Sequence, residues 1–177
     1  AGFSDALLKN HFTLYEGYVK NINALFERLA TLTKEGKTGP GEFAELKRRF
    51  AWEWNGVRLH ELYFDNMISG GKPLVDGGTL ANAIIATWGS VDAWMADFKA
   101  TGAMRGIGWT MLVRDDVTNR LENIWVNEHD VGHLVGAKPL LVMDVFEHAF
   151  MLDYGLKRAD YIEAFWKAID WSVVEGR

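Results

Sequence analysis

The sequence predicts an α+β fold in which an N-terminal antiparallel helical hairpin is followed by a small antiparallel sheet of about three strands flanked by helices. Across residues 8–64, apolar residues recur at steps of three and four, which is the period of an amphipathic helix. Between residues 109 and 144 the pattern changes to short apolar runs separated by turn residues, which is typical of strands. The loop over residues 70–78 separates the two patterns, so we divide the chain into domains 1–75 and 76–177.

The first two helices are expected to pair. Ser4 is a suitable N-cap, and the apolar stripe that follows it predicts a helix to about residue 32. Residues 35–41 contain three glycines and Pro40 and must form a turn. A second stripe predicts a helix that ends near residues 69–71, and two long helices joined by a short turn form an antiparallel hairpin. The stripe of the first helix contains Leu8, Phe12, Tyr15, Val19, Ile22, Phe26 and Leu29, and that of the second contains Phe50, Trp54, Val57, His60 and Phe64.

The rest of the chain mixes helices and strands. The expected elements are, in order, helices at 80–88 and 91–101, strands at 109–113, 121–126 and 140–144, and a final helix at 161–169. The polar turn at 115–119 makes the first two strands a hairpin.

Composition excludes several classes of function. The net charge of −5 and the lack of a basic stripe argue against nucleic-acid binding. No apolar run approaches the ~20 residues that span a bilayer, so we expect no membrane segment. The chain has no Cys, so any metal site must use His and carboxylate ligands. We take the cytoplasm as the default compartment.

Four residues stand out as possible metal ligands. His11 and His60 lie on the two paired helices, which a hairpin can bring together. Asp144 and His148 are four residues apart, about 40° around a helix, and both would also face one cavity if a strand ended at Asp144. A carboxylate combined with neutral imidazole suits a redox-capable first-row ion such as iron or manganese.

Several segments resemble known sequences. Residues 143–171, MDVFEHAFMLDYGLKRADYIEAFWKAIDW, closely resemble the C-terminal signature of iron/manganese superoxide dismutases, in which D-x-W-E-H-A precedes a Y-I-x-x-F-W-x-x-x-x-W stretch. Residues 88–113 resemble the family's middle region, residues 55–64 the region of its second ligand, and residues 11–23 the region of its first. The resemblance covers most of the chain in the same order.

This resemblance implies a site and a reaction. The ligands would be His11, His60, Asp144 and His148, holding one iron or manganese ion per chain, with superoxide as the substrate and dioxygen and hydrogen peroxide as the products. Glu147 corresponds to the residue that reaches across a homodimer interface to a ligand His of the partner; a tetramer built from such dimers is also compatible.

The resemblance also implies two catalytic residues, Tyr18 and His129, which would hydrogen-bond the solvent molecule at the metal. Some family members place a Gln donor four residues before the second ligand His, where this chain has Gly56. Other members supply the donor from the strand hairpin, and the spacing of His129 from Asp144 fits the subset that uses His there.

The first ligand has two candidate positions. The family usually spaces the first ligand His and the gateway Tyr eight positions apart, which would place Asn10 in the ligand position before Tyr18. A one-residue deletion would instead select His11. Seven residues come within ~20° of a full helical repeat, so we favour His11 on a regular α-helix that lacks a π-bulge.

Other positions depart from the family pattern. Leu14 and Phe150 replace a His and a Tyr that meet across the dimer in relatives, and Phe146 replaces a Trp. Because the chain is acidic and the substrate is an anion, we expect local attraction from a basic funnel at Lys157 and Arg158.

Two other classes of function stay open. One is a differently reactive metalloenzyme, such as an oxygenase with a two-His-one-carboxylate iron site. The other is a non-catalytic metal-binding protein that has kept the fold. The sequence does not distinguish iron from manganese.

Overall fold

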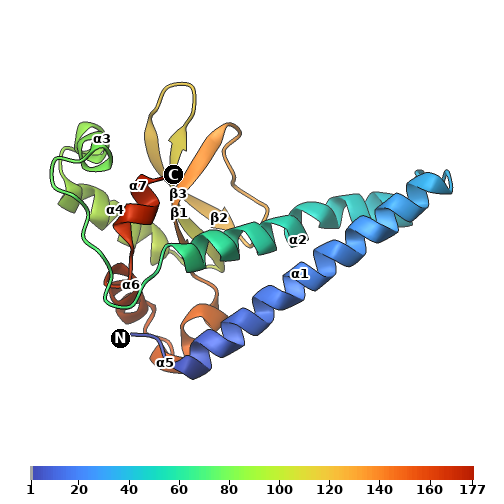
Figure 1. Cartoon of the computed structure of the whole chain (residues 1–177), viewed down its shortest axis with the longest axis horizontal. Helices are drawn as coiled ribbons and strands as arrows, with labels where there is room; N and C mark the ends of the chain where they lie inside the picture. Colours follow the sequence, from blue (N-terminus) through green and yellow to red (C-terminus); the bar gives the residue numbers. More distant parts are fainter. Residues whose placement is uncertain (1) are drawn as a thin grey trace.

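The computed structural model describes residues 2–177, and it has the predicted α+β architecture. Figure 1 shows a long helical hairpin that projects from the sheet and the remaining helices. The elements are α1 (Asp5–Lys34), α2 (Glu42–Asp65), α3 (Thr79–Trp88), α4 (Val91–Gly102), β1 (Gly108–Asp115), β2 (Leu121–Asn127), β3 (Ala137–Asp144), the 3-10 helix η1 (Glu147–Ala149), α5 (Met151–Tyr154), α6 (Arg158–Trp166) and α7 (Trp171–Glu175).

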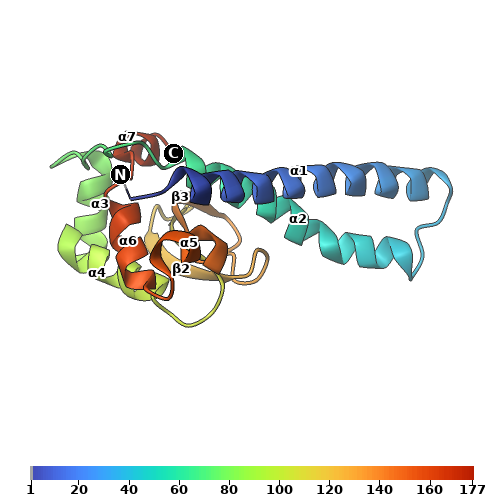
Figure 2. The same ribbon diagram turned by 90° about the horizontal axis from the view of Figure 1, so that it is seen from below.

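The hairpin begins as expected. The hydroxyl of Ser4 accepts a hydrogen bond from the backbone N–H of Leu7 at 3.1 Å, which confirms the predicted N-cap. The helices α1 and α2 then run side by side to the tip (Figure 2). There, Nε and Nη2 of Arg28 donate to the two carboxylate oxygens of Glu42 at 2.6 and 2.7 Å and connect the two helices.

Two details of the hairpin were predicted wrongly. Helix α2 ends at Asp65 rather than near residues 69–71, because the backbone after it pairs with the C-terminal segment: the backbone N–H of Ile68 donates to the backbone oxygen of Ala168 at 2.8 Å, and Met67 pairs with Ile169. The predicted stripe of α1 is also only partly confirmed: Ile22 and Leu29 are buried, whereas Phe12 and Phe26 are 45% and 44% exposed. A two-helix hairpin covers only a narrow strip of each helix, so part of the predicted stripe stays in contact with solvent. The buried residues of α1 are Leu7, His11, Ile22, Leu25, Leu29 and Leu32.

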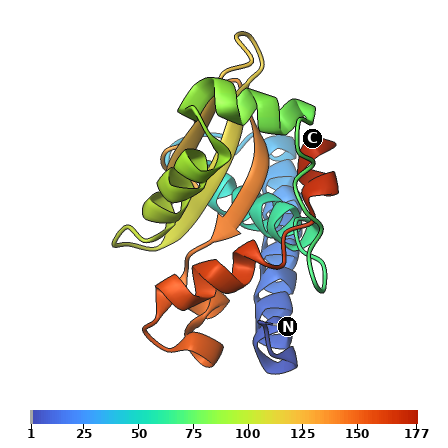
Figure 3. The same ribbon diagram turned by 90° about the vertical axis from the view of Figure 1, so that its left-hand side faces the viewer.

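The sheet has three antiparallel strands in the order β2-β1-β3, which confirms the predicted sheet. Helix α4 packs on β1 and β2, and α3 packs on β2, whereas α2 and α7 pack against β3 (Figure 3). The main core lies between these layers and contains large buried side chains such as Trp94, Phe98, Trp109 and Phe165.

The C-terminal segment folds differently from the prediction. The last long helix ends at Trp166 instead of residue 169, because Ile169 pairs with Met67 in a short antiparallel bridge. The short elements η1, α5 and α7 were not predicted. Among residues 2–177, no helix is both long and apolar enough to cross a bilayer. The division into domains 1–75 and 76–177 stays a prediction.

Candidate metal centre

Four side chains from distant parts of the chain meet at the base of the hairpin. His11 comes from α1, His60 from α2, Asp144 from the last position of β3, and His148 from η1. One ligating atom of each lies within 4.8 Å of the others. The side chains of the first three are at most 1% exposed, and that of His148 is 24% exposed. The structure therefore groups all four residues that the sequence singled out.

The regular geometry of α1 decides between the two candidates for the first position. Helix α1 is an uninterrupted α-helix from residue 5 to residue 34. His11 points into the cluster and Tyr18, seven residues later, lies on the same side, next to His60. Asn10 instead lies on the surface, beside Leu14.

Hydrogen bonds to the backbone orient two of the four residues. Nδ1 of His60 lies 2.5 Å from the backbone oxygen of Gly56, so Nδ1 is the donor and Nε2 carries the lone pair. Among residues 2–177, no hydrogen-bond partner exists for this buried Nε2. Oδ1 of Asp144 accepts from the backbone N–H of Phe146 at 2.8 Å, which leaves Oδ2 to face the imidazoles.

The interatomic distances fit a shared cation. Oδ2 of Asp144 lies 3.1 Å from Nε2 of His11, 3.1 Å from Nε2 of His148 and 3.7 Å from Nε2 of His60. Ligand atoms about 2.1 Å from one ion are separated by about 3.0–3.6 Å at ordinary coordination angles. The three imidazoles and one carboxylate suit iron or manganese, and a cation in the centre would engage the lone pair of His60.

The protonation states of His60 and Asp144 are those that bind a metal. Burial lowers the pKa of His60 to about 4, against the opposing effect of Asp144. Burial acts to raise the pKa of Asp144, but the charge of His148 and the hydrogen bond from His11 outweigh it and hold this pKa well below its usual range. For His148, burial acts to lower the pKa, and Asp144 more than compensates and raises it. A neutral His60 and an ionised carboxylate are thus available near neutral pH.

A second layer of hydrogen bonds surrounds the four residues. The indole N–H of Trp109 donates to Nδ1 of His129 at 3.1 Å. Burial lowers the pKa of His129 to about 4, so the ring is neutral and its single proton must be on Nε2. This Nε2–H therefore donates to the hydroxyl oxygen of Tyr18, 2.7 Å away. Burial raises the pKa of Tyr18 to about 12, so its own proton stays in place.

Aromatic rings enclose this layer. The ring of Trp52 meets that of His129 edge to face at 4.7 Å, and Phe146 stacks on His129 at 4.8 Å. Phe146 also stacks on His148 at 5.1 Å. The replacement of the expected Trp by Phe146 thus leaves both imidazoles covered by an aromatic face.

Gly56 has a steric role. A Cβ atom at this position would lie 2.4 Å from Cδ1 of Tyr18, far inside contact distance. The absence of a side chain at Gly56 therefore allows the ring of Tyr18 to pack against α2.

The other predicted residues lie around the centre. Glu147 is exposed and, together with Leu14, borders a shallow surface depression next to His148. Arg158 donates to the backbone oxygens of Met104 and Gly106 at 2.6 and 2.8 Å.

Two residues remain to be placed: Lys157, from the predicted basic funnel, and His133, the one His of the chain not yet described. Lys157 is exposed and is the N-cap of α6. His133, for which the sequence suggested no role, lies 2.9 Å from the backbone oxygen of His129 through its Nε2.

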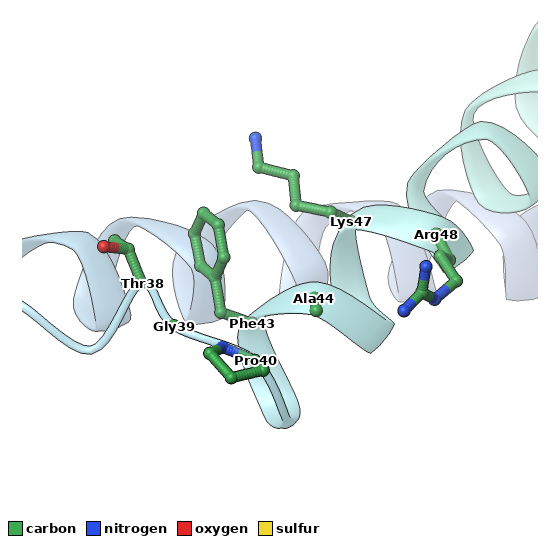
Figure 4. A pocket seen from close by; sticks show the side chains of 7 residues that line it. All are labelled: Thr38, Gly39, Pro40, Phe43, Ala44, Lys47 and Arg48. Atoms are coloured by element: carbon green, nitrogen blue, oxygen red, sulfur yellow. The ribbon is translucent and has the colours of Figure 1, made fainter.

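Sequence reasoning missed Trp109 and Trp52. A buried indole needs an acceptor for its N–H, which could have marked Trp109 as a donor to some polar group. Nothing in the spacing, however, pointed to His129. A separate depression at the hairpin tip (Figure 4) is lined by residues such as Thr38 and Lys47. It lies about 35 Å along α1 from His11, so it is not part of the centre.

The comparisons agree with this geometry. The profile for the C-terminal domain of iron/manganese superoxide dismutases matches residues 76–177. A manganese superoxide dismutase of Haloferax volcanii is 38% identical over 162 residues, covering 92% of this chain and 79% of its own length. Iron superoxide dismutases of Saccharolobus solfataricus and Aquifex pyrophilus are 35% and 37% identical, covering 91% and 99% of this chain and 78% and 84% of their own lengths. The chain therefore belongs to the iron/manganese superoxide dismutase family.

Proposed function

We propose that this protein converts superoxide to dioxygen and hydrogen peroxide at one iron or manganese ion held by His11, His60, Asp144 and His148. The observation that carries the proposal is the buried cluster of three imidazoles and one ionised carboxylate, in which Nε2 of His60 has no other partner among residues 2–177. Bound iron or manganese would supply one-electron redox chemistry between the +3 and +2 states. Relatives at 35–38% identity carry both metals in their names, so we leave the choice between the two ions open.

Tyr18 and His129 are the proposed catalytic residues, because their hydrogen bond has a defined direction. Nε2 of His129 donates to Tyr18, so the hydroxyl proton of Tyr18 is free to be donated to a small oxygen-containing molecule in the centre. Formation of hydrogen peroxide consumes two protons for every two superoxide ions. A phenol that stays protonated at neutral pH can hold such a proton in place.

Entry of the anionic substrate is assigned to Lys157 and Arg158, as the sequence suggested. The guanidinium of Arg158 lies 5.4 Å from the ring centre of Phe150, two residues after His148. This contact supports a cationic surface near the exposed side of the centre.

We also propose a two-fold homodimer built on the face that contains Glu147. This face exposes three apolar side chains beside the partly exposed His148: Leu14 at 42%, Met151 at 44% and Leu152 at 57%. Clustered exposed apolar side chains are typical of an interface. In such a dimer Glu147 is the residue proposed to reach the partner's ligand His. The cytoplasmic location stays a prediction.

The function is tested by metal analysis combined with a superoxide-consumption assay. Purified protein should contain about one iron or manganese ion per chain and should consume superoxide in proportion to that content. His11→Ala should remove both metal and activity, whereas the neighbouring surface variant Asn10→Ala should keep both. Full metal content without superoxide consumption would refute the proposed reaction and favour a non-catalytic or differently reactive metal protein.

A further inference from the structure

Helix α2 carries an unusual ion pair one to two turns before Gly56. Nε of Arg49 donates to Oε1 of Glu53 at 2.8 Å. The two side chains differ greatly in environment, since that of Arg49 is 53% exposed and that of Glu53 only 5%. Among residues 2–177, the second carboxylate oxygen of Glu53 has no hydrogen-bond partner.

The pair borders the second layer of the metal centre on two sides. Glu53, Gly56 and His60 are spaced three and four residues apart on α2 and therefore share one helix face, the face on which Gly56 meets Tyr18. The guanidinium of Arg49 lies 4.8 Å from the ring centre of Trp52, which in turn contacts His129.

The two charges of the pair do not cancel at the centre. Solvent and salt screen the exposed guanidinium, whereas the buried carboxylate is screened much less. The carboxylate of Glu53 is therefore the less screened of the two charges, and the guanidinium of Arg49 is the one that faces solvent.

An ordinary surface pair would not look like this one. Ion pairs within one helix usually have both side chains in water, as in the neighbouring pair of Arg48 and Glu45, which are three residues apart and 73% and 69% exposed. Burying a carboxylate with one unsatisfied oxygen is unfavourable for folding. Because burial of Glu53 destabilises the fold, we infer that this residue has a role in the metal centre.

We propose that the ion pair of Arg49 and Glu53 sets the affinity of the metal centre for small anions. Arg49 attracts an anion toward the side of the centre where Trp52 contacts His129, and Glu53 opposes its retention inside. The neutral products, dioxygen and hydrogen peroxide, are unaffected by either charge. Inert anions that would block the centre are bound less tightly than they would be without Glu53. This role rests on the proposed function, because it assumes that the cluster holds a metal ion open to anions.

The test is azide binding to the metal-loaded protein, followed by visible absorption. Glu53→Gln should tighten azide binding about three- to tenfold, and Arg49→Gln should weaken it by a similar factor. Both substitutions break the same ion pair. A purely structural role would therefore shift the affinity in the same direction in both variants, and that result, or no shift in either, would overturn the proposal.

Matched variants separate the local effect from other causes. Arg48→Gln and Glu45→Gln change the net charge equally, but both side chains are in solvent, at 73% and 69% exposure, and Arg48 lines the depression in Figure 4, so they should leave azide affinity unchanged. Equal shifts in these controls would overturn the proposal. Arg49→Lys keeps the charge and should keep the affinity, which guards against misfolding of Arg49→Gln. Superoxide consumption is measured on the same preparations; its absence would refute the reaction but not the azide result.

Discussion

The indole N–H of Trp109 donates to Nδ1 of His129 across 3.1 Å, and this single bond determines which nitrogen of His129 carries the proton. An indole can only donate, so Nδ1 must accept and the proton must be on Nε2. The direction of the next bond, from His129 to the hydroxyl of Tyr18, follows from this. A strand residue that contacts none of the four cluster residues through a hydrogen bond thus fixes the orientation of the proposed proton donor.

Trp109→Phe should release His129 from this tautomer. We expect nitrogen-15 NMR of the metal-free protein to show a mixture of both tautomers of His129, and superoxide turnover to fall about tenfold with the metal retained. Trp94→Phe is the matched control, because Trp94 is also fully buried and donates one hydrogen bond, to Asn123 at 3.0 Å. If both variants keep the wild-type tautomer of His129, the assignment of this role to Trp109 is wrong.

Gly56→Ala should disturb the centre through sterics alone. The added Cβ would overlap the ring of Tyr18, so we expect the ring to move and its bond to His129 to lengthen. Overpacking of this kind typically destabilises a protein by about 1–3 kcal/mol. Urea unfolding and superoxide consumption should both show a loss.

Gly17→Ala is the control for Gly56→Ala. A Cβ at Gly17 would meet nothing within 4 Å, and the position is inside α1. Ala there should stabilise the protein by up to about 1 kcal/mol through helix propensity, without changing turnover. Equal stabilisation by both substitutions would show that the ring of Tyr18 adapts freely.

The proposed dimer can be tested on its apolar face. Met151→Glu places a charge among the exposed apolar side chains near Glu147 and should shift the protein toward monomer in analytical ultracentrifugation. Val117→Glu, at a position that is 87% exposed in the strand turn, should leave the assembly unchanged. Glu147→Ala should weaken assembly and metal retention together. A wild-type monomer at micromolar concentration with full metal content would disprove the interface.

The four residues of the cluster were predicted mainly from the resemblance to the family, and local spacing supported part of the set. Asp144 and His148 lie only four residues apart, and the seven-residue step from His11 to Tyr18 matches a regular helix. Both spacings can be read directly from the sequence. The buried face of α1 could not be predicted from the sequence, because it depends on how α2 packs against α1. Phe12 looked like a core residue for this reason and is 45% exposed.

Tertiary contacts account for the other missed features. The end of α2 was predicted several residues too late because the backbone at Met67 and Ile68 pairs with residues 168–169, about 100 positions later in the chain, and the local sequence does not indicate this pairing. Trp109 and His129 are 20 residues apart on different segments, and only the sheet brings them together. The asymmetric burial of Arg49 and Glu53 was equally invisible, since their spacing is that of an ordinary surface pair.

The metal-free protein should lose stability as the pH falls from about 6.5 to about 4. Burial lowers the pKa of both His60 and His129 to about 4, whereas an unfolded chain has ordinary values near 6.5. In this window the unfolded state binds about two more protons than the folded state, so acid favours unfolding. The free energy of unfolding should therefore decrease by about 2.5 kcal/mol per pH unit near pH 5.

The titration of His148 has the opposite effect on the free energy of unfolding, and this effect occurs above about pH 6.5, outside the range from 6.5 to 4. Its pKa is raised by Asp144, so the stability that it contributes is present below about pH 6.5 and is lost as the pH rises through the folded value. Urea unfolding in the presence of a chelator, repeated from pH 4 to pH 8, measures both effects. His129→Gln should reduce the acid slope to about one proton, whereas His133→Gln, on an exposed loop residue, should not change it. A free energy of unfolding that stays constant between pH 6.5 and 4 would mean that His60 and His129 are not held neutral by burial.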